Sequence, residues 1–255
     1  ERRRFMQKQF DSLGLRAEFF AAVDASRGDL EGISRYDGER ALWTMGHPLS
    51  PGEVGCFASH YRLWERCVAM RTPIVVMEDD VRIDAGFQSA LGLTRDLIHR
   101  YGFLRLSALF TRRHQLVAQL DSRHQLIRYL KGPYGTQCYA LSPTGAQILI
   151  DHAKVWINAV DSYMDAFWTH GLASLAITPF HVASDEHGAD ASTIGHGRFR
   201  TPRPWYRELR RNITHFHGRV RRMIFNLRYG SRSRLERYVD LTLNNQHCQA
   251  GRPAE

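Results

Sequence analysis

The chain has 255 residues, of which 43% are hydrophobic and 24% charged, and its formal net charge is +9. This composition is close to the globular average and excludes a disordered or fibrous chain. The longest run of apolar side chains, residues 19–23, is far shorter than the roughly 20 residues that cross a bilayer, so no membrane-spanning helix is expected.

The first predicted elements are a helix over residues 3–13, ended by Gly14, and a strand over residues 17–23. Residues 26–46 are polar and punctuated by glycine, which indicates a long loop with room for one helical turn. Such a loop can carry function.

A strong helix start follows at Ser50-Pro51-Gly52-Glu53. Ser50 can cap the helix, Pro51 suits its first position, and Glu53 completes a capping box. The helix is expected to run to about Met70. The apolar run at residues 74–77 then predicts a buried parallel strand.

Helices and strands continue to alternate up to residue 178, which predicts an α/β fold with an open, largely parallel sheet flanked by helices. The expected elements are a helix over 85–100, strands over 103–108, 136–141 and 173–178, a hairpin within 115–131, and helices opening at Ser142-Pro143 and near Asp161. Four widely spaced cysteines, at positions 56, 67, 138 and 248, indicate reduced structural thiols.

The positive charge is concentrated near the C-terminus. Residues 198–238 contain thirteen arginines and two acids, so the rest of the chain is close to neutral. We therefore divide the chain into a body, residues 1–197, and a basic helical tail, residues 198–255.

Within the tail, apolar residues recur every three or four positions and define one helical stripe, which spans roughly 80° of arc at about 100° per residue. The stripe consists of Trp205, Leu209, Ile213, Phe216, Val220, Met223 and Leu227. Such a helix suits an anionic membrane surface, because apolar groups enter the lipid while arginines meet phosphates. Packing on the chain's own domain is an equal alternative, and an RNA-binding arm a third.

Three consecutive acids, Glu78, Asp79 and Asp80, follow the apolar run at residues 74–77. Carboxylates side by side repel each other unless a cation or water meets them. Ligands of open α/β sheets bind at the carboxyl ends of strands, and carboxylate oxygens suit Mg²⁺ or Mn²⁺. The pattern favours a metal site over a solvated acidic turn. No phosphate loop or dinucleotide fingerprint is present.

Two blocks carry a resemblance to a known family: residues 49–60, LSPGEVGCFASH, and residues 76–81, VMEDDV. Together they closely resemble the family 25 glycosyltransferases, which include lipooligosaccharide galactosyltransferases of Gram-negative bacteria. Weaker matches are Arg2-Arg3, residues 19–24, residues 135–142, Val160-Asp161 and residues 192–194. The family pattern begins with a strand that would precede Glu1.

The resemblance implies a GT-A type fold and a nucleotide-sugar donor, with the acidic triplet in the role of a D-x-D motif. Asp80 and Glu78 would then hold Mn²⁺ or Mg²⁺, with His187 as a further metal ligand. The donor would be bound by Glu78, Asp79, Asp24, Glu53, His60 and Thr136. Glu53 and His60 share one helix face, although Glu53 has its main role in the capping box.

An inverting transfer, which the family implies, needs a base for the acceptor hydroxyl. Asp161 and Asp165 are the candidates, four residues apart and therefore on one helix face. Asp161 is interpreted equally well as a helix N-cap. The expected function is transfer of a hexose, galactose from UDP-galactose, onto a lipid-linked oligosaccharide.

The expected place of this reaction is the cytoplasmic face of the inner membrane, with no nucleic acid as partner. Two alternatives remain open. One is a metal-dependent phosphohydrolase that uses the same triplet, and the other is a non-enzymatic protein that binds RNA or another anion.

Overall fold

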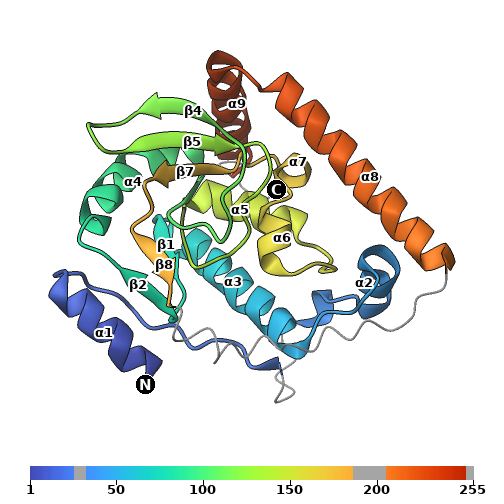
Figure 1. The fold of residues 1–255 in the computed structure, drawn as a ribbon, viewed down its shortest axis with the longest axis horizontal. Helices are drawn as coiled ribbons and strands as arrows, with labels where there is room; N and C mark the ends of the chain where they lie inside the picture. Colours follow the sequence, from blue (N-terminus) through green and yellow to red (C-terminus); the bar gives the residue numbers. More distant parts are fainter. Residues whose placement is uncertain (26–32, 186–204, 251–255) are drawn as a thin grey trace.

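A computed structural model of the chain describes residues 1–25, 33–185 and 205–250. It shows an open sheet of six strands flanked by helices, with a separate two-stranded ribbon (Figure 1). The predicted α/β class is therefore confirmed. In the described part of the chain, no helix combines the length and the apolar character needed to cross a bilayer.

The six-stranded sheet has the order β1-β6-β3-β7-β5-β4. Its strands are β1 (Ile74–Met77), β3 (Phe103–Arg105), β4 (His114–Gln119), β5 (Gln125–Tyr129), β6 (Cys138–Leu141) and β7 (Leu175–Thr178). Strands β1, β3, β7 and β4 point one way, whereas β6 and β5 run opposite. The sheet is thus mixed, and only the β3–β7 neighbours pair in parallel.

Strand β1 corrects one expectation. It lies at the edge of the sheet and pairs antiparallel with β6 through Ile74↔Leu141 to Met77↔Cys138, with Val75 exposed. The prediction of a buried parallel strand is wrong because β6, far along the chain, inserts between β1 and β3. The chain after the acidic triplet forms β2 (Val81–Ile83), which pairs with β8 (Val182–Ser184). Neither short strand was expected.

The N-terminal helix α1 (Arg2–Ser12) matches the prediction, and Gly14 after it adopts a positive φ of 60°. The strand predicted at residues 17–23 is absent, since this segment has no ladder partner. It runs instead along α3, where the backbone N–H of Val23 donates to Ser59 Oγ at 2.8 Å. A Cβ on Gly55 would come within 2.5 Å of the Val23 carbonyl, so glycine permits this close approach.

The expected long loop at residues 26–46 contains more structure than predicted: a short 3₁₀ turn η2 (Ile33–Arg35) and the two-turn helix α2 (Gly38–Met45). Asp37 caps α2 by accepting from the Arg40 N–H. The following helix α3 (Pro51–Met70) has the predicted capping box, in which Glu53 N–H donates to Ser50 Oγ at 3.2 Å and Ser50 N–H donates to Glu53 Oε2 at 2.8 Å.

Four further helices are α4 (Phe87–Tyr101), α5 (Pro143–His152), α6 (Val160–Met164) and α7 (Phe167–His170). The first three confirm predicted helices, whereas α7 was not predicted as a separate helix. Ser142 caps α5 by accepting from Gly145 N–H, as its sequence indicates. The β4–β5 hairpin is also as predicted. Helix α6, however, is capped by Ala159, so the N-cap interpretation of Asp161 is wrong.

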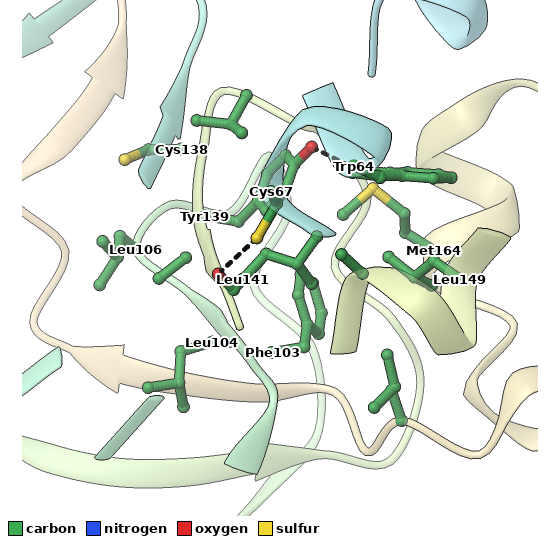
Figure 2. Packing of buried hydrophobic residues seen from close by; sticks show 14 of the residues in the cluster. Trp64, Cys67, Phe103, Leu104, Leu106, Cys138, Tyr139, Leu141, Leu149 and Met164 are labelled. Atoms are coloured by element: carbon green, nitrogen blue, oxygen red, sulfur yellow. Dashed lines mark hydrogen bonds between the residues drawn. The ribbon is translucent and has the colours of Figure 1, made fainter. Parts of the chain in front are cut away.

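The hydrophobic core lies between α3 and the middle of the sheet. Figure 2 shows Trp64 and Cys67 of α3 against Tyr139 and Leu141 of β6, with Phe103 of β3 beside them. Burial raises the pKa of the Cys67 thiol to about 11, as expected of an inert structural thiol. Cysteines 56, 67 and 138 are all free.

Two long helices complete the described chain: α8 (Trp205–Arg228) and α9 (Arg232–Ala250). The side chains Leu235, Val239 and Leu243 place α9 within the main core. Helix α8 lies along the outside of α2 and α7 (Figure 1). Over residues 205–250, the part of the predicted tail that the structure describes, the chain is therefore helical and contacts the body.

Candidate functional site

The acidic triplet lies at the end of β1, as the sequence predicts. The backbone N–H of Glu78 continues the ladder to Gln137 O at 2.9 Å, and the N–H of Asp185 donates to Asp80 O at 2.8 Å. The triplet therefore bridges the end of the large sheet and the start of the β2–β8 ribbon. Its three side chains have different surroundings.

Glu78 turns toward the protein. Its Oε1 accepts a hydrogen bond from Thr136 Oγ1 and lies 3.8 Å from His60 Nε2. Burial alone would raise the pKa of Glu78, but His60, the Thr136 hydroxyl and Arg2 outweigh it and lower the pKa. Glu78 is therefore held as a carboxylate.

His60 is buried on α3, and the ring nitrogen that does not face Glu78 has a partner of its own. Its Nδ1 lies 2.8 Å from the Tyr139 hydroxyl, which accepts from Trp64 Nε1 at 3.0 Å. Burial would lower the pKa of His60, but Tyr139, Cys56 and Glu78 raise it well above its ordinary value. The sequence prediction that His60 reaches the site is consistent with this position.

Asp79 and Asp80 face outward to different degrees. Asp79 is exposed and pairs with Arg2 at 3.2 Å, whereas Asp80 is half-buried. Burial and then the charge of Glu78 raise the pKa of Asp80, which Arg2 only partly offsets. Glu78 and Asp80 thus repel each other, and a cation beside Asp80 would relieve this repulsion.

The loop that carries Thr136 is held by a buried ion pair. Arg105 Nη2 lies 2.5 Å from Asp165 Oδ1, and Arg105 Nη1 donates to Gly135 O at 2.8 Å. The other carboxylate oxygen of Asp165 accepts from Tyr134 N–H at 2.8 Å. A Cβ on Gly132 would collide with the Asp165 carboxylate, so the loop can close on Asp165 only with glycine there.

Comparison with known proteins identifies the family to which the chain is related. The family model described as glycosyltransferase family 25 (LPS biosynthesis protein) matches residues 1–164, which include the triplet, His60, Thr136 and Asp161. The chain belongs to glycosyltransferase family 25. The resemblance drawn from the two sequence blocks is confirmed.

Similar family 25 proteins occur in insects and mammals. A glycosyltransferase 25 family member from Anopheles gambiae is 41% identical over 104 residues, covering 38% of this chain and 17% of that protein. The corresponding protein from Aedes aegypti is 37% identical over 108 residues, covering 40% and 18%. An inactive glycosyltransferase 25 family member 3 from Mus musculus is 29% identical over 179 residues, covering 63% and 30%. The chain spans less than a third of each relative's length.

The divalent ion that family 25 implies can be tested against the side chains present. The carboxylates of Glu78 and Asp80 supply hard oxygen ligands, and the half-buried Asp80 is repelled by the charge of Glu78. These residues therefore fit Mn²⁺ or Mg²⁺. His187, the third predicted ligand, lies outside the described residues.

A second ligand group overlaps with the first. Among the described residues, ligand atoms of Cys56, His60 and Glu78 lie within 4.8 Å of one another. Cys56 and His60 are one turn apart on α3, so both reach Glu78 from the same helix face. This mixed sulfur, nitrogen and oxygen set suits zinc better than manganese.

The remaining predicted residues are more dispersed. Asp24 is exposed in the segment beside α3, and Glu53 is buried in the capping box at the start of that helix. Asp161 is half-buried on α6, with its Oδ1 accepting from the Ser162 N–H at 2.5 Å. Both oxygens of Asp165 have partners.

Two residues of the site were not predicted. Arg105 is buried in β3 between apolar neighbours, and a lone arginine in an apolar run signals a hidden carboxylate partner, because buried charges are paired. Arg2 contacts Asp79 across 77 positions of sequence. The sequence near Arg2 and near Asp79 gives no indication of the contact between them.

Proposed function

We propose that this chain is a hexosyltransferase that uses a nucleotide-sugar donor, with UDP-galactose as the preferred donor. The observation that supports this most is the position of the triplet at the end of β1, with Glu78 fixed by Thr136 and Asp80 half-buried. Family membership supports the same reaction class.

In this proposal, Asp80 and Glu78 hold the divalent ion beside the donor diphosphate. The ion would supply charge neutralisation for the nucleoside diphosphate that leaves as the glycosidic bond breaks. Asp79, at the exposed side of the triplet, would contact the ribose, while Thr136 keeps the Glu78 carboxylate oriented. Asp24 and Glu53 would contact the donor from the α3 side.

The base is assigned to Asp161. Its carboxylate is partly exposed and can accept the proton of an acceptor hydroxyl as that oxygen attacks the anomeric carbon. Asp165 is the weaker candidate because both its oxygens are already engaged by Arg105 and by the Tyr134 N–H. Asp165 therefore influences the site indirectly, by holding the loop that carries Thr136.

Product analysis tests the reaction class. The protein is incubated with UDP-galactose, Mn²⁺ and a lactose-like acceptor, and the expected product is a new glycosidic linkage to the acceptor. Release of UDP and free galactose at the same rate with and without acceptor would contradict transfer and indicate hydrolysis of the glycosidic bond. Release of UMP and galactose 1-phosphate would favour the phosphohydrolase.

For the acceptor, we propose a lipid-linked oligosaccharide at an anionic membrane surface, the cytoplasmic face of the inner membrane. The supporting observation is the orientation of α8. Most of its apolar stripe faces solvent, with Trp205, Phe216 and Leu227 exposed by 76%, 64% and 69%. Arginines flank this stripe, as in helices that lie in the lipid interface.

The side of α8 that meets the body is polar and aromatic. Arg210 stacks over Trp43 at 5.6 Å and Arg222 over Trp168 at 5.5 Å. Asn226 accepts from Arg128 at 2.7 Å. Because these contacts use the opposite side of the helix, the apolar stripe is available to lipid. Figure 1 shows α8 on the side of the molecule opposite α1 and β2.

A further inference from the structure

Two histidines from separate parts of the chain face each other through their Nε2 atoms, away from the proposed donor site. His124 directly precedes β5, and His181 lies between β7 and β8. Their Nε2 atoms are 3.1 Å apart. The His124 side chain is buried, and only 14% of the His181 side chain is exposed.

The other nitrogen of each ring faces an aspartate. His124 Nδ1 lies 2.8 Å from Asp121 Oδ2, and His181 Nδ1 lies 2.7 Å from Asp84 Oδ1. An ionised carboxylate only accepts hydrogen bonds, so each Nδ1 carries the proton. Both Nε2 atoms are then left with a lone pair.

Two lone pairs facing each other at 3.1 Å repel unless a positive charge lies between them. A shared proton or a metal ion can supply that charge. Ligating histidines commonly donate their second N–H to a carboxylate, which fixes the tautomer and raises ligand basicity. Two nitrogens at Zn–N distances of about 2.0–2.1 Å in tetrahedral geometry lie about 3.3 Å apart, close to the observed separation.

Both carboxylates are held by backbone N–H groups. Asp121 accepts from the N–H of Arg123 and of His124, each at 2.7 Å, and these bonds lower the pKa of Asp121 to about 2. Asp84 accepts from Gly86 N–H at 2.7 Å. A Cβ on Gly86 would come within 2.2 Å of the His181 ring, so glycine makes room for this histidine.

The pair is separated from the acidic triplet by the length of the β2–β8 ladder. Asp80 meets Asp185 at one end of the ribbon, and Asp84 meets His181 at the other. Four residues of strand correspond to about 13 Å. A ligand at the histidine pair therefore need not share any residue with the donor site.

We propose that His124 and His181 form a binding site for a divalent transition-metal ion, with Zn²⁺ as the probe ion. The two Nε2 atoms are the protein ligands, water completes the coordination, and Asp121 and Asp84 orient the rings. On binding, the ion takes the place of the proton between the rings, and that proton is released to solvent. This inference is independent of the proposed transferase activity.

The test is calorimetric titration of Zn²⁺ into the full chain after chelator treatment, in a Cys56→Ser/Asp80→Asn background. These two substitutions remove one ligand from each of the two other metal groups, Cys56–His60–Glu78 and Glu78–Asp80. One ion is expected to bind with an affinity that His124→Gln and His181→Gln each lower at least tenfold. His114→Gln, an exposed histidine, is the matched control and should have no effect.

Two further measurements keep the outcome decisive. Asp84→Asn should weaken Zn²⁺ binding about 10- to 100-fold, although both ligating histidines remain. Zn²⁺ should raise the melting temperature of the protein that has both histidines but not that of the His124→Gln or His181→Gln variants. Zn²⁺ affinity that is unchanged in both histidine variants would overturn the proposal. An absence of Zn²⁺ binding by the Cys56→Ser/Asp80→Asn protein would also overturn it, because a shared proton between the rings would then account for their contact.

Discussion

Arg105 and Asp165 illustrate how a residue far from the reacting atoms can shape the site. Their ion pair is fully buried and ties β3 to the end of α6. The loop between them carries Thr136, whose hydroxyl donates to Glu78. The orientation of the Glu78 carboxylate, which we propose to bind the donor and the ion, thus depends on a charge pair two contacts away.

Breaking this pair is expected to be costly. Asp165→Ala leaves a buried guanidinium without its partner, and removing one member of a buried pair costs about 3–5 kcal/mol. Denaturant unfolding should show a loss of that order in the free energy of unfolding. The exposed Asp151→Ala serves as a control and should change it by no more than about 0.5 kcal/mol.

A double-mutant cycle sharpens the test. Arg105→Met combined with Asp165→Ala should cost less than the sum of the two single variants, because neither charge is left alone. Equal losses for Asp165→Ala and Asp151→Ala would contradict the assigned role. A stability readout is needed because Asp165 is also a candidate base, and activity alone would not separate the two roles.

Individual site residues could be predicted from sequence when their signal was local. The capping box of Ser50 and Glu53 depends on neighbouring positions and was predicted correctly. The inward turn of Glu78 depends on His60 and Thr136, 18 and 58 positions away, and no spacing rule indicates it. The N-cap interpretation of Asp161 failed because the helix begins earlier, with Ala159 as its cap.

At the scale of elements, α8 shows the limit of a periodic pattern. The spacing of its apolar residues predicted the helix correctly, but not which side meets the body. That choice follows from Trp43 and Trp168, which offer ring faces to arginines on the opposite side of the helix. The strand predicted at residues 17–23 is absent because no strand pairs with this segment, and the backbone N–H of Val23 donates to Ser59 of α3 instead.

The exposed stripe of α8 makes a direct prediction about membranes. Replacing Phe216 and Leu227 by Ser should weaken binding to vesicles that contain phosphatidylglycerol by at least about tenfold, since each large apolar side chain contributes about 1.5–3 kcal/mol when buried. Vesicle sedimentation measures this. Leu116→Ser, at a similarly exposed position of β4, is the matched control.

The charge of the same helix can be tested separately. Arg219→Glu with Arg221→Glu should weaken vesicle binding in low salt, because each basic residue near an anionic surface contributes about 1 kcal/mol. Both arginines are exposed, unlike Arg222, which stacks on Trp168. Vesicle binding that is unchanged in both sets of variants would exclude α8 as the attachment surface.

For the whole molecule, the α/β class followed from the alternation of helices and strands, whereas the order of the strands did not. The alternation predicted an open, largely parallel sheet but no order of its strands. In the structure, β6 inserts between β1 and β3, and the β4–β5 hairpin extends the far edge. These pairings join distant parts of the chain, so local sequence patterns do not determine them.

The central claim is that the acidic triplet holds a divalent ion against the diphosphate of a sugar donor. Calorimetric titration of UDP-galactose, with and without Mn²⁺, tests it on the parent chain, on Asp80→Asn and on the control Asp96→Asn, an exposed acid of α4. Because burial and then Glu78 raise the pKa of Asp80, its neutralisation should not lower the melting temperature.

The predicted result is binding that requires Mn²⁺ in the parent chain and in Asp96→Asn, and that falls at least about 100-fold in a folded Asp80→Asn variant, as expected from removal of a charged ligand worth roughly 3 kcal/mol. Equal binding with and without Mn²⁺, or full Mn²⁺-dependent binding in Asp80→Asn, would contradict the account.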